Sequence, residues 1–398
     1  MKILMLSWEF PPRIVGGISP HVYNLSLELS KLGVDVCVLT CDFPGSPAFE
    51  TIEGVKIYRV DSYKFPAPDF TSWVFMMNTN MKISAGNIVT ANEKEISLIH
   101  AHDWLVADTA IGLKHILRKP LVTTLHSTEY GRRNGINSDY QRLIHETEKW
   151  LSYESWRVIC CSNYMASHVH AVLNIPNNKL EVIPNGIDAK EFNYVYDRAG
   201  FRKRFVNSTE KLVLFTGRLV HEKGVLVLID AITTVLRDID AKFIIVGAGY
   251  LKDEINRRVS EMGISDKVYL TGFIDDETSK KLFMIADVCV VPSLYEPFGI
   301  VALEAMAAKT PVVVSQVGGL VEIVEHDQTG VIVYQNNSES LAWGIKRVLT
   351  DERYADRIRL NAFRRVSEEY DWSCIAKKTL RFYEKILTEY EENDWKPL

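Results

Sequence analysis

The stretch KILMLSWEFPPRIVGGISPHVYNLSLELSKLGVDVCVLT, residues 2–40, decides the fold class. It opens with an apolar run at 2–8, crosses a loop rich in proline and glycine, and continues with apolar residues at helical spacing over 19–32. A second apolar run follows at 34–40. Strand, loop, helix and strand in this order build parallel α/β sheets, which bind ligands at the carboxyl ends of their strands.

The same alternation fills the rest of the chain. In the first half, strands are predicted at 55–60, 98–101, 121–125, 158–161 and 180–183. The pattern restarts in the second half, with strands predicted at 211–216, 242–246, 267–270, 287–291, 311–315 and 331–333. Long polar helices are predicted at 139–153 and 373–391. Because 398 residues exceed one ordinary domain, we expect two α/β domains, 1–190 and 205–372, with the boundary in the irregular stretch 186–210.

Composition is that of an ordinary globular enzyme. Apolar residues make up 47% and charged residues 24%, and the net charge of −5 gives no basic excess for a nucleic-acid partner. No apolar run approaches the ~20 residues that span a bilayer, and the first residues lack the features of a signal peptide. The cysteines show no CxxC spacing: Cys37, Cys41, Cys160, Cys161, Cys289 and Cys374. We therefore expect a cytoplasmic protein with buried, reduced thiols and no transmembrane segment, which leaves peripheral membrane contact and oligomeric state open.

An aromatic stretch at 58–75 contains Tyr63, Phe65, Phe70 and Trp73. Such a stretch is most often a packed loop, and this is the interpretation that we favour. The alternatives are that it lines an acceptor groove or touches a membrane surface.

Two loops have the residues that bind phosphate. Gly16 and Gly17 lie between a strand and the start of a helix, where the backbone can approach an anion and the helix dipole favours negative charge. Arg218 and Lys223 follow the strand at 211–216, and both stay charged at neutral pH. Together they are suited to a diphosphate, although two solvated cations at a strand end are the simpler alternative.

A third loop joins the strand at 287–291 to a helix that starts near Gly299. Glu296 precedes this helix, and Glu304 lies eight residues after Glu296. The two would be ~12 Å apart along the axis if the whole segment were helical. Two carboxylates at this spacing suit hydroxyls at the two ends of a nucleotide sugar, Glu296 at the transferred sugar and Glu304 at the ribose. The alternative is a capped surface helix with two solvated glutamates.

Histidines end two of the predicted strands. His126 follows the strand at 121–125, where it is either on the ligand side of the sheet or a hydrogen-bonded structural imidazole. His100 and His102, followed by Asp103, have a spacing that metal sites also use. Outside this His-x-His-Asp segment no acidic or cysteine partner lies nearby in the sequence, so a metal site is disfavoured.

Several common nucleotide motifs are missing. The chain has no GxxxxGK[ST] motif, which argues against a P-loop nucleotidase. Gly247 and Gly249 begin a GxGxxG pattern, but Lys252 stands at its third glycine. The one DxD, Asp238 to Asp240, precedes a strand and is interpreted as a solvated turn. We therefore expect no metal cofactor, with fixed cations taking the metal's role.

These motifs together resemble the GT-B retaining glycosyltransferases, specifically group 1 (family 4, GT4) and its glycogen and starch synthase relatives (family 5, GT5). The resemblance runs over nearly the whole chain. Its elements are Trp8-Glu9-Phe10-Pro11-Pro12 with Gly16-Gly17, Pro184-Asn185-Gly186-Ile187-Asp188, Gly217-Arg218-Leu219 with Glu222-Lys223-Gly224, and the paired glutamates Glu296 and Glu304. It implies two Rossmann-like parallel-sheet domains facing a central cleft, with the acceptor on the first and the nucleotide sugar on the second. It also implies a C-terminal helix, about 373–398, that crosses back to the first domain.

The resemblance also implies roles for individual residues. Arg218 and Lys223 are expected to hold the donor diphosphate, Glu296 the sugar hydroxyls and Glu304 the ribose. His126 is the expected active-site histidine near the transferred sugar. The full donor-binding set is Gly16, Gly17, Arg218, Lys223, Glu296, Phe298, Gly299, Ile300, Val301 and Glu304, and the catalytic set is His126, Arg218, Lys223, Glu296 and Asp103.

The expected donor is glucose carried by ADP or UDP, because residues 102–104 are similar to a glycogen and starch synthase segment whose aspartate lines the acceptor side. Bacterial glycogen synthases usually carry a lysine where Ile14 stands, which points to the broader group 1 family. The expected reaction is transfer with retention to a saccharide, such as an α-glucan. Alternatives are lipid-linked or small acceptors, a nucleotide-sugar epimerase of the same fold, and a relative that binds the nucleotide but transfers nothing.

Overall fold

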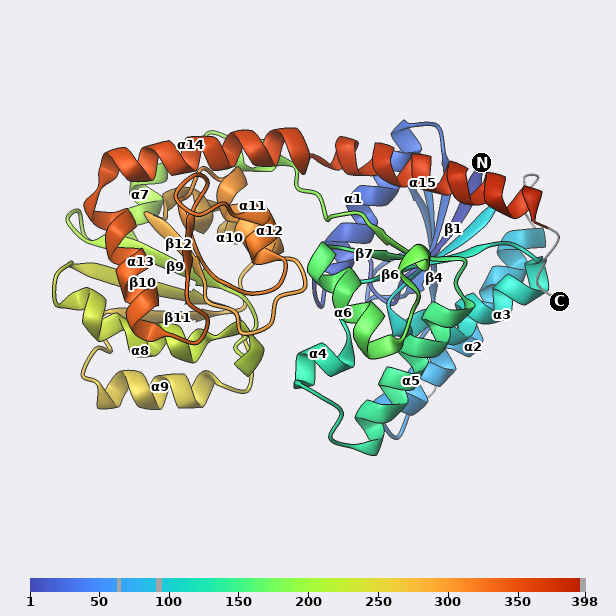
Figure 1. Cartoon of the computed structure of the whole chain (residues 1–398), viewed down its shortest axis with the longest axis horizontal. Coiled ribbons are helices and arrows are strands. Elements are labelled where there is room, and N and C mark those ends of the chain that lie inside the picture. The colour runs from blue at the N-terminus through green and yellow to red at the C-terminus, as the bar shows by residue number, and fades with distance from the viewer. Residues whose placement is uncertain (63–65, 91–94, 394–398) are drawn as a thin grey trace. The chain divides into compact units, whose positions relative to one another are not determined.

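The computed structural model describes residues 1–62, 66–90 and 95–393 (Figure 1). The chain forms two compact units. The N-terminal unit comprises Met1–Gly186 and Trp372–Leu398, and the C-terminal unit comprises Ile187–Asp371. The chain thus leaves the first unit at the beginning of the irregular stretch, and its last helix belongs to the first unit.

The N-terminal unit is built on an eight-stranded sheet with the order β3-β4-β2-β1-β5-β6-β7-β8. All neighbouring strands are parallel except β3 and β4. The strands are β1 (Lys2–Leu6), β2 (Asp35–Cys41), β3 (Phe49–Ile52), β4 (Val55–Val60), β5 (Leu98–His102), β6 (Leu121–Leu125), β7 (Arg157–Cys160) and β8 (Leu180–Val182). The α-helices are α1 (Ile18–Lys31), α2 (Phe70–Thr90), α3 (Ala107–Leu117), α4 (Glu129–Arg133), α5 (Asp139–Glu154), α6 (Asn163–Leu173) and α15 (Trp372–Glu392).

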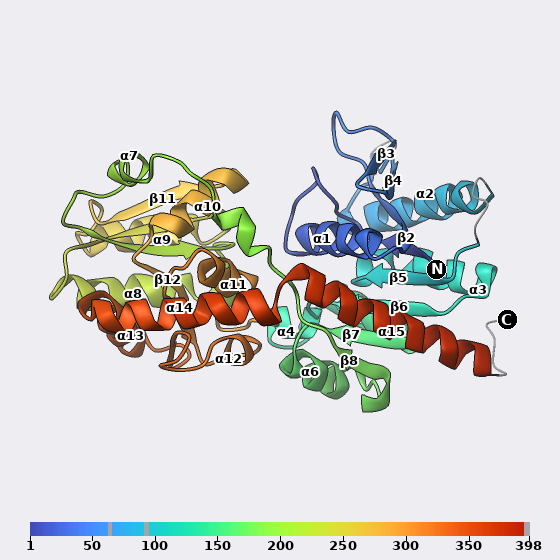
Figure 2. The same ribbon diagram turned by 90° about the horizontal axis from the view of Figure 1, so that it is seen from above.

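Helices cover both faces of this sheet because its central strands are apolar on both sides. On β1, Ile3 and Met5 point to one face, where they pack with α1 and α15. Leu4 and Leu6 point to the other face, towards α2 and α3. Helices α1 and α15 lie side by side (Figure 2), so the C-terminal helix completes the core of the N-terminal unit.

The C-terminal unit has a six-stranded parallel sheet with the order β11-β10-β9-β12-β13-β14. The strands are β9 (Lys211–Thr216), β10 (Ala241–Val246), β11 (Val268–Gly272), β12 (Val288–Val291), β13 (Val312–Ser315) and β14 (Val331–Val333). The α-helices are α7 (Arg198–Lys203), α8 (Val225–Leu236), α9 (Lys252–Glu261), α10 (Asp276–Ile285), α11 (Ile300–Ala307), α12 (Leu320–Ile323), α13 (Ser338–Thr350) and α14 (Glu352–Glu369). Short 3₁₀ turns include η1 (Trp104–Val106), η2 (Asn177–Lys179), η3 (Ala189–Phe192) and η4 (His221–Lys223).

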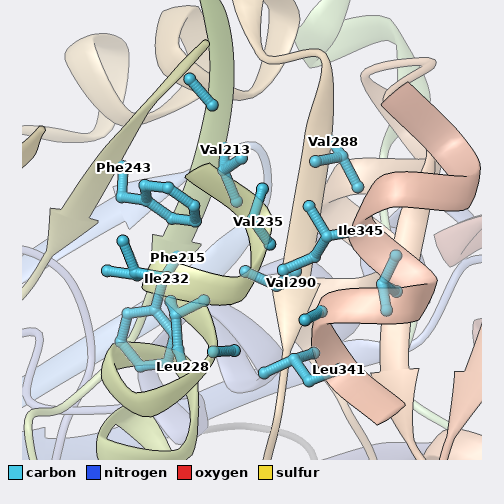
Figure 3. Packing of buried hydrophobic residues seen from close by; sticks show 14 of the residues in the cluster. Val213, Phe215, Leu228, Ile232, Val235, Phe243, Val288, Val290, Leu341 and Ile345 are labelled. Carbon is cyan, nitrogen blue, oxygen red and sulfur yellow. The ribbon is translucent and has the colours of Figure 1, made fainter. Parts of the chain in front are cut away.

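The core of this unit lies between its sheet and helices α8, α9 and α13. Figure 3 shows Leu228 and Ile232 of α8 meeting Val213 and Phe243 of the sheet, with Ile345 of α13 beside them. Each such fully buried side chain contributes about 1.5–3 kcal/mol relative to its exposed form. This packing fixes β9 and β12 as neighbours, and the loops after these two strands carry the candidate donor residues.

Every strand predicted above is present, within one to two residues. Several elements were missed, including helix α7 inside the stretch predicted to be irregular, strand β3 and helix α2. Strand β3 is short and half exposed, and α2 begins at Phe70, so the packed-loop interpretation of the aromatic stretch is wrong from Phe70 onward. Trp73 is buried on α2 and packs edge-on against Trp8, while Tyr63 and Phe65 lie outside the described residues.

All six cysteines are free, and five of them are buried; Cys374 is partly exposed. Burial raises the pKa of the Cys41 thiol to about 11 and that of Cys160 to about 12. Within residues 1–62, 66–90 and 95–393, no helix combines the length and the apolar character that crossing a bilayer requires.

Candidate active site

The loops that follow β9 and β12 bring two predicted site residues into direct contact. Lys223, at the end of η4, donates a hydrogen bond from Nζ to Glu296 Oε2 over 2.8 Å. Ser293 Oγ donates to the same carboxylate oxygen over 2.9 Å. The backbone joins the same loops, because the N–H groups of Leu294 and Tyr295 donate to the carbonyl oxygen of Glu222. Lys223 and Glu296 are 73 residues apart in the sequence, and the sheet order makes them neighbours.

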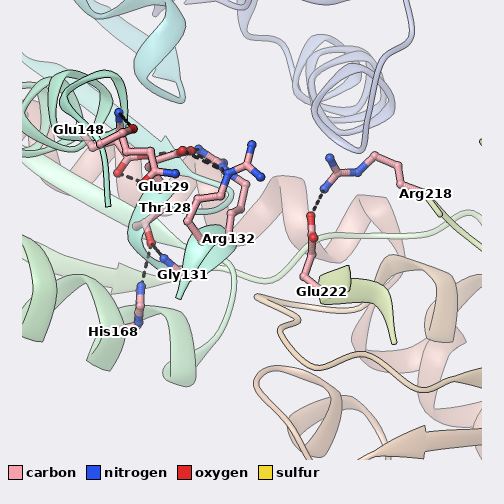
Figure 4. A network of polar contacts seen from close by, with 11 residues as sticks. Thr128, Glu129, Gly131, Arg132, Glu148, His168, Arg218 and Glu222 are labelled. Carbon is pink, nitrogen blue, oxygen red and sulfur yellow. Dashed lines mark hydrogen bonds and ion pairs between the residues drawn. The ribbon is translucent and has the colours of Figure 1, made fainter. Parts of the chain in front are cut away.

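Arg218 also has a carboxylate partner. Its guanidinium donates to Glu222 Oε1 over 3.1 Å, as the dashed line in Figure 4 shows. The Arg218 side chain is 57% exposed, whereas Glu222 is 16% exposed. The predicted pair of uncompensated cations is therefore a charge-balanced set of two cations and two carboxylates. An exposed ion pair of this kind is weak, so Arg218 can exchange Glu222 for a phosphate at low cost.

Glycines allow these loops to approach each other closely. A Cβ added to Gly247 would lie 1.9 Å from the carbonyl oxygen of Gly217, beside Arg218. A Cβ added to Gly224 would lie 1.9 Å from the carbonyl oxygen of Pro292. Gly247 and Gly249, which resemble part of a dinucleotide fingerprint in the sequence, thus have a packing role that holds the Arg218 loop in place.

Helix α11 begins directly after Glu296. Gly299 caps it with φ = +117°, and the helix runs over Ile300–Ala307. Its first N–H groups, including those of Ile300 and Val301, have no partner within the helix and attract anions. The segment from Glu296 to Glu304 is therefore a loop followed by a helix, and the offset calculated for a continuous helix does not apply.

Phe298 and Glu304, two further predicted donor residues, are enclosed by this part of the unit. Phe298 is 4% exposed and its ring packs near that of Tyr370, so the ring is enclosed by protein. Burial, together with the charges of Asp276 and Glu191 and against that of Lys280, raises the pKa of Glu304 to about 7. A carboxyl with a raised pKa in a partly enclosed place is a candidate binding group.

The glycines of the N-terminal unit, Gly16 and Gly17, precede α1 as predicted, and Gly17 caps it. The N–H groups of Val15, Gly16 and Ser19 already donate to the carboxylate of Glu9, at 2.6, 3.0 and 3.2 Å. Glu9 is 1% exposed, and burial raises its pKa. An internal carboxylate therefore holds the N–H group of Gly16, which corrects the prediction of an open anion site there, while the predicted role of Gly17 stays a prediction.

Asp103 supports His126. Asp103 Oδ1 accepts a hydrogen bond from the backbone N–H of His126 over 2.7 Å. The backbone of Asp103 has φ = 60° and ψ = 175°, a conformation that is almost confined to glycine and costs about 1–3 kcal/mol. Burial raises the pKa of its carboxyl to about 6, against the opposing charge of Arg132. Strain at a buried carboxylate is typical of functional sites.

Arg132 belongs to a buried polar network that sequence reasoning missed (Figure 4). Its guanidinium lies 3.1 Å from Glu129 Oε2 and 3.4 Å from Glu148 Oε1. Glu148 also accepts from the backbone N–H of Glu129, and burial raises the Glu148 pKa to about 8. Thr128 caps α4 and contacts His168 Nε2 over 2.7 Å. This network holds the loop that follows His126.

His126 lies in a cluster of histidines. Its Nε2 is 3.2 Å from His102 Nδ1, and its ring centroid is 4.6 Å from that of His21. Burial lowers the pKa of His126 to about 3 and keeps the ring neutral. His100 is occupied elsewhere, with its two nitrogens bonded to Tyr383 and Thr124. His21, on the buried face of α1, was not predicted, because its spacing is that of a core residue.

The acidic pair at 238–240 has the solvated role that the sequence predicts. Asp240 pairs with Lys267 over 2.7 Å, and Asp238 pairs with Lys346 over 2.8 Å. Both aspartates precede β10, at the end of the strand opposite to the loops described above.

Known proteins match this chain over both of its units. The model described as "Glycosyltransferase Family 4" matches residues 15–191, and "Glycosyl transferases group 1" matches 197–365. An uncharacterised glycosyltransferase of Methanocaldococcus jannaschii is 42% identical, over 96% of this chain and 98% of its own. A glycogen synthase of Mycobacterium tuberculosis is 35% identical, over 96% of this chain and 94% of its own.

Solved structures give the same fold. A sucrose-phosphate synthase from Thermosynechococcus elongatus has a TM-score of 0.82 and 25% identity, covering 98% of this chain and 99% of that one. The sequence matches extend through both units and agree with the two parallel sheets. The chain therefore belongs to the group 1, or family 4, glycosyltransferases, which have the GT-B fold.

Proposed function

We propose that this glycosyltransferase transfers glucose, with retention of configuration, from ADP-glucose or UDP-glucose to a saccharide acceptor of the α-glucan type. The observation that carries the proposal is the contact between Lys223 and Glu296 beside the start of α11. This contact places a cation, a carboxylate and helix N–H groups at the ends of two adjacent strands. A nucleotide sugar offers the matching groups, a diphosphate and a hydroxylated ring.

Donor binding would exchange the partners of the ion pairs. The diphosphate takes the place of Glu296 at Lys223 and that of Glu222 at Arg218. Glu296 is then free to accept hydrogen bonds from sugar hydroxyls, while Glu304 accepts from the ribose. After the exchange Glu296 keeps hydrogen bonds from Ser293 and the sugar hydroxyls in place of its cation.

The chemical step breaks the bond between the sugar and the phosphate, and negative charge grows on the leaving diphosphate. Arg218, Lys223 and the first N–H groups of α11 stabilise that charge because they are in place before the reaction. The acceptor hydroxyl attacks from the face that the leaving group vacates, and its proton passes to the departing phosphate. The fixed cations make a divalent ion dispensable for this step.

Glucose and an α-glucan acceptor are favoured by the name of one relative, a glycogen synthase at 35% identity. His126 and Asp103 of the N-terminal unit would contact the transferred sugar and the acceptor. Neutral His126 is suited to donate or accept a hydrogen bond without adding charge. A small sugar acceptor is the second candidate, favoured by the likeness to a sucrose-phosphate synthase.

The test is a grid of ADP-, UDP- and GDP-sugars against glycogen, maltooligosaccharides, monosaccharide phosphates and lipid-linked sugars, each with and without EDTA. We expect turnover with ADP- or UDP-glucose and an α-glucan, an α-linked product by NMR, and no loss in EDTA. Conversion of the donor without an acceptor would identify an epimerase. Donor binding without turnover on any acceptor would reject a transferase.

A further inference from the structure

A pocket of about 850 Å³ lies at the amino ends of two strands of the N-terminal sheet. Its wall includes Leu121 and Arg157, the first residues of β6 and β7. Residues near the C-terminal ends of α3, α5 and α15 complete the wall. His126 follows the other end of β6, so this pocket and the candidate active-site histidine lie at opposite edges of the same sheet.

Two of the cations in this pocket are matched by carboxylates. Lys114 Nζ lies 2.7 Å from Glu154 Oε2, and His115 Nε2 lies 3.3 Å from the same oxygen. Arg157 pairs with Glu389 over 2.7 Å. Both carboxylates are therefore already compensated, and they do not neutralise further cations in the pocket.

Lys179 is the unmatched cation of the pocket. Within the described ranges it forms no ion pair, and its Nζ donates to the carbonyl oxygen of Tyr153. An ammonium group has three N–H donors, so further donors remain for a ligand. Burial, followed by the charges of Lys114 and Arg157 acting against that of Glu154, lowers the pKa of Lys179 to about 8. The ammonium group thus lies in a positive potential, which a bound anion would offset.

Aromatic rings and a further carboxylate form the rest of the recognition surface. The Tyr153 side chain is 72% exposed, and its ring centroid lies 5.5 Å from Lys179 Nζ. Trp156 meets Tyr390 edge-on, with ring centroids 5.4 Å apart. Aromatic rings suit the apolar face of a sugar ring, and the exposed carboxylate of Glu392 can accept hydrogen bonds from hydroxyls.

We propose that this pocket binds a small phosphorylated sugar, with its phosphate at Lys179 and its ring beside Tyr153 and Trp156. Inorganic phosphate would pair with the cation but leave the aromatic rings uncovered. A neutral sugar would cover the rings but leave Lys179 unmatched. A sugar phosphate satisfies both parts of the pocket, through a charge-assisted hydrogen bond at one end and ring contacts at the other.

This proposal is independent of the proposed function. The residues of the pocket lie at the amino ends of the strands, whereas the diphosphate residues Arg218 and Lys223 belong to the C-terminal unit. Binding at the pocket is measured without any nucleotide sugar, so either proposal can fail while the other holds.

Crystals of the wild-type protein soaked in glucose 6-phosphate test the site without any variant. We expect electron density for the phosphate within hydrogen-bond distance of Lys179 Nζ, and for the sugar ring against Tyr153 or Trp156. No density in this pocket, or density only beside Arg218 and Lys223, would overturn the proposal. The second of these results would leave the diphosphate site of the proposed function intact.

Calorimetric titration with glucose 6-phosphate, inorganic phosphate and glucose compares the whole ligand with its two parts. The wild type should bind glucose 6-phosphate at least about tenfold more tightly than either part. Lys179→Gln should weaken this binding at least about tenfold, because it removes a charge-assisted hydrogen bond. Tyr153→Ala, at an exposed side chain that the fold does not need, should weaken it about two- to tenfold.

Two control variants locate the binding. Lys149→Gln removes an exposed lysine of α5 that is not part of the pocket, and it should bind glucose 6-phosphate as the wild type does. Arg218→Ala should also bind it normally, since Arg218 belongs to the other unit. Equal affinity in the wild type and Lys179→Gln would overturn the proposal. Binding of inorganic phosphate or of glucose as tight as that of glucose 6-phosphate would also overturn it.

Discussion

Lys223 Nζ lies 2.8 Å from Glu296 Oε2, so the cation predicted to hold phosphate and the carboxylate predicted to hold sugar are each other's partners. Glu296 is 7% exposed, and its only other side-chain partner among the described contacts is Ser293. A carboxylate this enclosed needs its cation. Substitutions at Lys223 therefore act on stability as well as on catalysis, and the two effects have to be measured separately.

Lys223→Ala should lower kcat/KM by about 10²–10³-fold, because it removes a group that stabilises the leaving diphosphate. It should also lower the free energy of unfolding by about 1–3 kcal/mol, since Glu296 stays buried with one fewer partner. Steady-state kinetics and urea unfolding on the same preparation separate the two effects. Lys346→Ala is the matched control, because it removes a lysine paired with the exposed Asp238.

Arg218→Ala should lower kcat/KM by a similar factor with little change in stability, since its side chain is 57% exposed. Normal kcat/KM in both Arg218→Ala and Lys223→Ala would reject the assignment of the diphosphate site.

The strands were predictable because buried parallel strands are continuous apolar runs bounded by turns. Helix α2 was missed although the signal exists. Its buried positions Trp73, Met77, Met81 and Ala85 recur at intervals of four residues, a helical period that the aromatic residues before it obscured.

The residues of the candidate site were likewise predictable only in part. Lys223 and Glu296 were predictable because each follows an apolar strand, where a parallel sheet places its ligands. The residues that contact these site residues and change their electrostatic environment were not predictable. Glu9 reaches the start of α1 through a loop conformation, and His21 meets Asn185 across 164 residues. The contact between His21 and Asn185 forms only when the sheet assembles, so no local spacing encodes it.

Gly247→Ala should disrupt the Arg218 loop, because the added Cβ would lie 1.9 Å from the carbonyl oxygen of Gly217. We expect a donor KM at least about tenfold higher, together with a lower melting temperature. Gly263→Ala is the matched control, since Gly263 also has a positive φ but has no atom within 4 Å of the added Cβ. Both variants introduce backbone strain at a positive φ, but only Gly247→Ala should lose donor affinity. Equal kinetics in the two variants would show that the close approach is not needed.

Glu304→Gln should change how stability depends on pH. The folded-state pKa of Glu304 is raised from 4.5 to about 7 by burial. Its contribution to stability is therefore fully present below pH 4.5 and is lost as the pH rises through about 7. Glutamine does not titrate, so the variant does not lose this contribution. The difference in free energy of unfolding, variant minus wild type, should therefore rise by up to about 3 kcal/mol between pH 4.5 and 8. Urea unfolding of both proteins across this pH range measures this difference, and a difference that does not change with pH would contradict the raised pKa.

Asp103→Gly separates backbone strain from the carboxylate. Glycine relieves a strain of about 1–3 kcal/mol at φ = 60°. It also removes the hydrogen bond to the N–H of His126, which contributes about 1.5–3 kcal/mol when the acceptor is charged. The two changes offset each other in stability, so the melting temperature should move little, while kcat/KM should fall at least about tenfold because the loop that carries His126 loses its anchor.

Asp103→Asn keeps both the strain and an acceptor oxygen, and it removes the titration. The pKa of Asp103 is about 6, so protonation in the wild type should reduce kcat/KM as the pH falls through 6. Asp103→Asn should lack this acid limb and should keep intermediate activity. A pH profile from 5 to 8 for both proteins tests this. If Asp103→Gly has full activity, then Asp103 has no role in catalysis. If Asp103→Asn keeps the fall in kcat/KM at low pH, then the pH dependence belongs to another group.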